Sequence, residues 1–135
     1  MPHLRKTAEV FMALYVSGFG AYVAAYAVAG RNSLAWSGLE ITEALCFAYA
    51  CMITATVHAV GIWLNGDRHW SPYLRLVGLL FGSALFIFLA WLGSVRVNTA
   101  GFTYLWVGMG FLAALRTAVI DCVLSWRGRY GNIRT

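Results

Sequence analysis

The sequence predicts an all-α fold, an integral membrane four-helix transmembrane bundle with both termini in the cytoplasm (N-in/C-in). Hydrophobic residues occupy 61% of the 135 positions and charged residues only 11%, whereas roughly a quarter of the residues in a soluble domain are charged. The apolar residues also form four long runs, and about 20 apolar residues are what a helix needs to cross a bilayer. This composition argues against a secreted disulfide scaffold, a nucleic-acid module and a cytosolic enzyme.

The four runs lack charge over most of their length. The first has no charged residue from Val10 to Gly30, and the second has only His58 between Ala44 and Gly66. The third has none from Leu76 to Val95. In lipid, an isolated apolar segment satisfies its backbone polar groups only as a helix. We therefore expect helices over residues 9–30, 40–64, 74–95 and 100–126.

The connections between these runs are short and contain turn-forming residues, at positions 31–38, 65–72 and 96–100. They leave no room for a second domain, so residues 1–135 are expected to form a single four-span transmembrane domain.

The fourth run contains one charged residue near its middle, Arg116. If the span begins at Val97, Arg116 reaches the inner interface of the membrane. If the span runs from Gly101 to Trp126, Arg116 is embedded in the membrane. Trp106 and Trp126 would lie about 30 Å apart along a helix, which slightly favours the embedded position.

Basic residues are unevenly divided between the two sides of this topology. The side with both termini has seven: Arg5, Lys6, Arg68, Arg75, Arg127, Arg129 and Arg134. The opposite side has Arg31 and Arg96. Because cytoplasmic loops carry an excess of Lys and Arg, we expect both termini in the cytoplasm and place the protein in a bacterial inner membrane. Lipid headgroups account for the net charge of +5, so no nucleic-acid partner is expected.

Polar residues gather on one face of the second span and one face of the fourth. Steps of three or four residues connect Glu40, Glu43, Phe47, Cys51, Thr54, His58, Gly61 and Asn65, and likewise Gly110, Ala114, Thr117, Asp121 and Ser125. A charge that faces hydrocarbon costs energy, so both faces are expected to turn inward, toward each other. The candidate functional polar face consists of Glu43, Thr54, His58, Asn65, Thr117 and Asp121.

At comparable depth on their helices, His58 and Asp121 are expected to make contact, directly or through water. Two alternatives stay open at this point. Both residues could be structural hydrogen-bonding groups between helices. Glu40 and Glu43, at the start of a helix, could simply stabilise its N-terminal dipole.

Small residues mark the positions where helices are expected to pack closely. Gly20 lies in a row of small residues on the first span, and Gly78 and Gly82 form a GxxxG pair on the third. Gly110 has the same role on the small and polar face of the fourth span.

The sequence contains no nucleotide-binding, hydrolase or zinc motif, and His58 is the one histidine well inside a span. No catalytic, cofactor-binding or metal-binding residue is therefore predicted, and the protein is expected not to be an enzyme. The leading hypothesis is a self-associating membrane protein whose polar helix faces line a pore or a helix contact, as in phage holins. The alternatives are an accessory membrane-anchor subunit of a respiratory or redox complex, and a small proton or solute transporter using Glu43, His58 and Asp121. The expected partners are the lipid bilayer and either further copies of the chain or a membrane complex.

Overall fold

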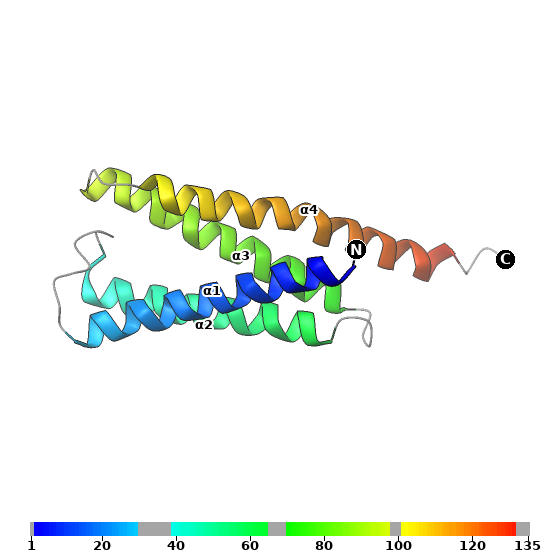
Figure 1. The fold of residues 1–135 in the computed structure, drawn as a ribbon, viewed down its shortest axis with the longest axis horizontal. Coiled ribbons are helices and arrows are strands. Elements are labelled where there is room, and N and C mark those ends of the chain that lie inside the picture. Colours follow the sequence, from blue (N-terminus) through cyan, green and yellow to red (C-terminus); the bar gives the residue numbers. More distant parts are fainter. Residues whose placement is uncertain (1, 30–38, 65–69, 98–100, 132–135) are drawn as a thin grey trace.

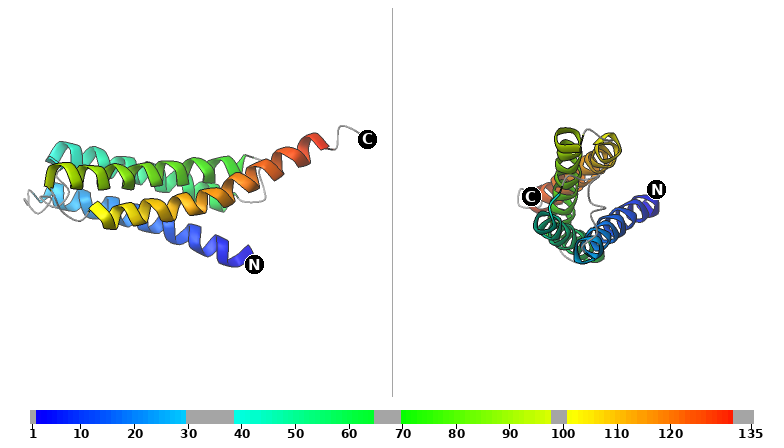
Figure 2. Two further views of the ribbon diagram at one scale, coloured as in Figure 1. Left: turned by 90° about the horizontal axis from the view of Figure 1, so that it is seen from above. Right: turned by 90° about the vertical axis from the view of Figure 1, so that its left-hand side faces the viewer.

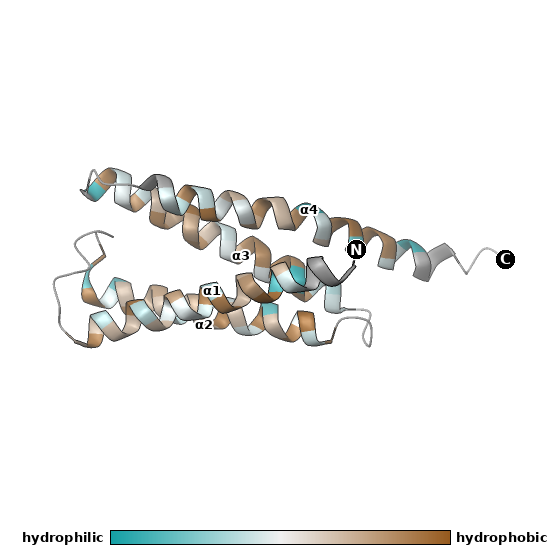
Figure 3. Ribbon diagram, in the orientation of Figure 1, coloured by the Kyte–Doolittle hydropathy of each residue, from teal (hydrophilic) through white to brown (hydrophobic). Residues whose placement is uncertain are grey.

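The computed structural model describes residues 2–29, 39–64, 70–97 and 101–131. Four helices follow one another: α1 Pro2–Val28, α2 Ile41–Trp63, α3 Ser71–Leu92 and α4 Gly101–Gly131, with a π-helical turn, η2 Gly93–Val97, after α3 (Figure 1). Each helix contains a segment long and apolar enough to cross a membrane, and hydrophilic residues are sparse along all four (Figure 3). The expectation of an all-α protein with four helices of membrane-spanning length is therefore confirmed.

The helices extend beyond the apolar runs that predicted them. α1 already begins at Pro2 and α4 continues to Gly131, so polar residues prolong both helices outside the apolar segments. α3 begins at Ser71, with Pro72 in its first turn, where the missing N–H of proline is tolerated. The turn expected over residues 96–100 is wrong at its start, because residues 93–97 continue as η2.

The connecting residues 30–38, 65–69 and 98–100 lie outside the described residues. This leaves out Asn65 of the candidate polar face.

Helices that are neighbours in the chain pack against one another, α1 on α2, α2 on α3 and α3 on α4. The expectation that the polar faces of the second and fourth spans meet directly is wrong, because α3 lies between α2 and α4. Glycines of α3 make this arrangement possible. A Cβ at Gly78 would lie 2.5 Å from the Cβ of His58 in α2, and a Cβ at Gly82 would lie 2.8 Å from the Phe111 ring in α4. Without side chains at these positions, both neighbours approach α3 closely.

The other two expected packing glycines behave differently from each other. α1 meets α2 at Gly20, where an added Cβ would lie 2.8 Å from the Cβ of Cys51. At Gly110 an added Cβ would meet no atom within 4 Å, so Gly110 makes no close packing contact with the described helices. The reason is the rotation of α4, which turns the buried Phe111 and Ala118 toward the core and leaves Gly110 outside.

Aromatic rings, one from each helix, meet in the middle of the bundle. The centroid of the Phe19 ring lies 6.2 Å from that of Phe47 and 5.4 Å from that of Phe86, and Phe86 lies 5.8 Å from Phe111. Phe86 is completely buried. We call these four residues the aromatic core.

α1 begins and α4 ends at the same end of the bundle, as Figure 1 shows. At that end the two helices diverge from each other, which is clear when the bundle is seen from above in Figure 2.

Candidate functional site

Arg75 of α3 connects three helices from a buried position. Its Nε donates a hydrogen bond of 2.7 Å to Glu9 Oε2 of α1, and its Nη2 donates to Glu9 Oε1. Its Nη1 lies 3.3 Å from Asp121 Oδ2 of α4. Arg75 and Glu9 are only 6% and 5% exposed. The paired, two-oxygen contact with Glu9 is the strongest geometry that an arginine and a carboxylate adopt.

The imidazole of His58 brings the remaining helix, α2, to the same place. His58 is 1% exposed, and its Nε2 lies 3.6 Å from Glu9 Oε2, slightly too far for a hydrogen bond. Among the described residues Nε2 has no hydrogen-bond partner. Every helix thus contributes one residue to a single group: Glu9, His58, Arg75 and Asp121, which we call the charged cluster.

The charged cluster lies close to the end of the bundle where α1 begins and α4 ends. Glu9 follows Thr7, the start of the first apolar span, by two residues, and Arg75 follows the start of the third span at Ser71 by four. His58 precedes the end of the second span at Trp63 by five. At about 1.5 Å per residue, these side chains start about 3–8 Å inside the spans. The charged cluster therefore lies inside the candidate membrane-spanning segments but near one end of them.

The charged cluster is not balanced when His58 is neutral. Two carboxylates, Glu9 and Asp121, then face one guanidinium, which leaves a formal charge of −1. A proton on His58 or on either carboxylate brings the formal charge to zero.

Access to the charged cluster differs among its members. The Asp121 side chain is 31% exposed, whereas those of His58, Glu9 and Arg75 are between 2% and 7% exposed. Asp121 is therefore the member through which water or a solute would reach the others.

The structure brings only part of the candidate polar face together. His58 and Asp121 belong to the same cluster but do not touch, because Glu9 and Arg75 lie between them. Thr54 is buried one turn before His58, and Thr117 is half-buried one turn before Asp121.

Glu43 lies at the opposite end of the bundle from His58 and Asp121, so it is not a member of the charged cluster. It accepts a 2.8 Å hydrogen bond from Nη1 of Arg96 in η2, and both residues are nearly half exposed. Its Oε2 also accepts the backbone N–H of Glu40, 3.1 Å away, which caps the start of α2. The stabilising role at the helix start, which the sequence left as an alternative, fits this geometry.

Two members of the charged cluster, Glu9 and Arg75, were not predicted as site residues from the sequence. Glu9 received no role, and Arg75 was counted among the basic residues flanking a loop. The signal was present: Glu9 precedes the small residue Ala13 by four positions, and Arg75 precedes Gly78 by three. Both therefore lie on the faces that the small residues had already marked as packing faces.

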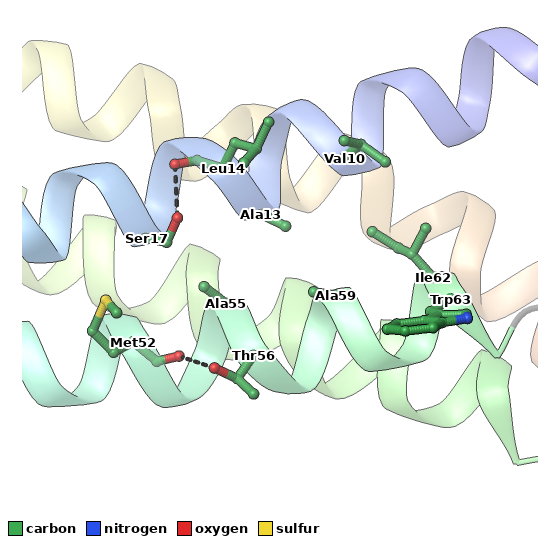
Figure 4. Close-up of a pocket in the computed structure, with 10 residues that line it drawn as sticks. All are labelled: Val10, Ala13, Leu14, Ser17, Met52, Ala55, Thr56, Ala59, Ile62 and Trp63. Carbon is green, nitrogen blue, oxygen red and sulfur yellow. Dashed lines mark hydrogen bonds between the residues drawn. The ribbon is translucent and has the colours of Figure 1, made fainter.

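An apolar groove with a volume of about 330 Å³ lies between α1 and α2 near this end of the bundle (Figure 4). The two hydroxyl groups in its lining are used within their own helices: Ser17 donates to the Leu14 carbonyl oxygen and Thr56 to that of Met52. The groove therefore suits a hydrocarbon chain of a lipid better than a polar ligand. In the described part of the chain, no three His, Cys, Asp or Glu side chains converge closely enough to hold a metal ion.

No protein-family model matches the chain, and no curated protein or solved structure is detectably similar to it.

Proposed function

We propose that the chain is a non-enzymatic membrane protein that binds a proton at the charged cluster and passes it across the bilayer. The observation that carries this proposal is the composition of the cluster: two carboxylates and one imidazole around one buried guanidinium, with one residue from every helix. Ionisable residues buried in membrane spans are expensive and usually belong to ion or proton pathways.

The geometry supports a defined order of events. A proton arrives at Asp121, the most exposed member, and passes through water, not through the Arg75 guanidinium, to the Glu9–His58 pair, whose facing atoms are 3.6 Å apart. With a proton on Nε2, His58 becomes a donor toward Glu9 Oε2, which gives this buried nitrogen the partner it lacks. Arg75 holds Glu9 and Asp121 in place throughout.

Transfer to the other side of the membrane needs a second conformation. The aromatic core lies between the charged cluster and the Glu43–Arg96 pair at the opposite end of the bundle. Its packed rings offer no path for a proton in the conformation described here. The proposal therefore includes a movement of the helices that opens the aromatic core while the proton is bound.

Vesicles that contain the purified protein and a pH-sensitive dye test this proposal. A potassium gradient with valinomycin supplies the membrane potential, and acidification of the interior reports proton entry. We expect flux with the natural chain, and flux at the level of protein-free vesicles for His58→Gln and Asp121→Asn. These substitutions remove proton-binding groups but preserve size and polarity.

Glu40→Gln is the matched control, because Glu40 is an exposed carboxylate at the far end of the bundle. It should leave the flux unchanged. The absence of faster proton entry into vesicles with the natural chain than into protein-free vesicles would falsify the proposal. So would Asp121→Asn vesicles that conduct as well as those with the natural chain.

We also propose that the end bearing the charged cluster faces the cytoplasm of a bacterium, with the chain in the inner membrane. Arg75 does not flank a loop as expected, but the remaining basic residues still favour the side where α1 begins and α4 ends. Green fluorescent protein fused after Thr135 is expected to fluoresce, and alkaline phosphatase at the same position to be inactive. Active phosphatase there would show the opposite orientation.

A self-associating, holin-like membrane protein is the second candidate function. The polar faces of α2 and α4 are used inside one chain, which disfavours them as the lining of a pore between copies. One observation nevertheless favours association, the exposed side chain of Arg116 on α4. An accessory role in a larger complex would use the same exposed face.

A further inference from the structure

We propose that α4 carries the contact surface for a second copy of the chain, in which Arg116 of each copy pairs with the partner's Asp121. This interface requires neither proton transfer nor a pore, so it stands or falls separately from the proposed function.

Arg116 is a positive charge that pairs with no residue in the described part of its own chain. Trp106 and Trp126 are both more than half exposed and lie 20 residues apart on α4. That separation corresponds to about 30 Å of helix, the thickness of the hydrocarbon core, and Arg116 lies at its midpoint. Arg116 is exposed and has no hydrogen bond or ion pair with any described residue. An arginine exposed at mid-membrane needs a partner outside its own bundle.

Asp121 supplies the complementary feature. It shares the single guanidinium of Arg75 with Glu9, so the carboxylates outnumber that cation, and almost a third of the Asp121 side chain is exposed. α4 therefore carries both Arg116, which has no described partner, and Asp121, which shares its only cation with Glu9.

The surface between these two charges is suited to close helix packing. Arg116 and Asp121 are separated by about 140° around the helix at 100° per residue. Gly110, Ala113 and Thr117 project into the sector between them, and none is fully buried. An added Cβ at Gly110 would meet no atom within 4 Å. Small residues of this kind let the backbones of two membrane helices approach closely.

A second copy satisfies both charges at once, and this is why we choose it over lipid or another protein. Two copies in the same orientation are related by a two-fold axis along the membrane normal, so each contact is formed twice. Two α4 helices packed through Gly110, Ala113 and Thr117 carry Arg116 on one flank and Asp121 on the other. The charges are offset by about 7.5 Å along the axis, which a long arginine side chain can span. A lipid headgroup would have to reach mid-membrane to do the same.

Disulfide cross-linking in membranes tests the proposed contact. In a background with Cys46, Cys51 and Cys122 replaced by alanine, Ala113→Cys is expected to give a cross-linked dimer on mild oxidation. Ile53→Cys is the matched control, because Ile53 is exposed in the middle of α2 but away from the proposed surface. It should stay monomeric. A monomer with Ala113→Cys, or equal cross-linking at both positions, overturns the proposal.

Charge exchange then tests the ion pairs. Arg116→Glu should abolish cross-linking through Ala113→Cys, because it places like charges next to each other in both contacts. Mixing this variant with an Asp121→Lys chain should restore a mixed dimer, since each contact then joins opposite charges. If Asp121→Lys does not fold, Arg116→Leu alone tests the pairing. Reduced cross-linking through Ala113→Cys then supports the pairing, and unchanged cross-linking contradicts it. Proton flux is measured separately, so failure of one proposal leaves the other testable.

Discussion

Replacing Arg75 with leucine is expected to destabilise the folded bundle by about 3–5 kcal/mol, the usual cost of removing one partner from a buried ion pair. Arg75 donates both Nε and Nη2 to Glu9 and lies beside Asp121. Leucine would leave Glu9 buried without a counter-charge and would release α1 and α4 from α3. Loss of helical circular dichroism in mixed micelles of increasing SDS fraction measures the change.

Two further variants separate the charge of Arg75 from its geometry. Arg75→Lys keeps the charge but not the two-oxygen contact, so its stability should fall between that of the natural chain and that of Arg75→Leu. Arg127→Leu, which removes an exposed arginine near the end of α4, should change stability by less than about 0.5 kcal/mol. If Arg75→Leu unfolds at the same SDS fraction as the natural chain, the charged cluster does not hold the helices together.

Replacing Gly78 with leucine is expected to cost about 3 kcal/mol, at the upper end of ordinary overpacking in a core. A Cβ at this position would lie 2.5 Å from the Cβ and 2.9 Å from the Cα of His58. Because a backbone atom is involved, a rotamer change cannot relieve the clash, and α2 must move away from α3. The same movement would separate His58 from Glu9, so proton flux should fall together with stability.

Gly18→Leu is the matched control for Gly78→Leu. An added Cβ at Gly18 meets no atom within 4 Å, and the residue lies on the outer surface of α1. Its effect in the same SDS titration should stay within about 0.5 kcal/mol. Equal effects at Gly18 and Gly78 would contradict the close contact between α2 and α3.

The four helices could be predicted because length and hydropathy alone determine them. Each run is long enough to cross a bilayer, and lipid leaves a single polypeptide segment no other regular structure. The order of helices around the bundle could not be predicted in this way. The small residues Gly78 and Gly82 serve two different neighbours, His58 of α2 and Phe111 of α4. The spacing of small residues in a sequence shows that a helix has a face suited to close packing. It does not show which neighbouring helix packs against that face.

The charged cluster was accessible to sequence reasoning only in part. His58 and Asp121 stood out because they lie deep inside apolar runs, where polar residues are rare. Glu9 and Arg75 lie within two and four residues of the span starts, where charged residues normally face headgroups. Their burial depends on the tertiary structure, since each has its partner on another helix. Extending the small-residue faces by one turn toward the N-terminus would have pointed to both.

Arg116 differs from Glu9 and Arg75, because the structure gives it no partner among the described residues. The sequence left its position open between the membrane and the interface, and the structure places its side chain on the outer surface of α4. In this structure Arg116 makes no hydrogen bond or ion pair with another described residue. The proposed pairing of Arg116 involves a second copy of the chain, and neither periodicity nor hydropathy describes a contact between copies.

Glu9 and Arg75 form a buried pair at the centre of the charged cluster, and a double-mutant cycle measures that pairing directly. Stability is measured for the natural chain, Glu9→Gln, Arg75→Gln and the double variant by SDS titration. We expect a coupling energy of at least about 1.5 kcal/mol, so that the double variant is barely less stable than Arg75→Gln alone. Losses that simply add, with a coupling energy near zero, would contradict the pairing.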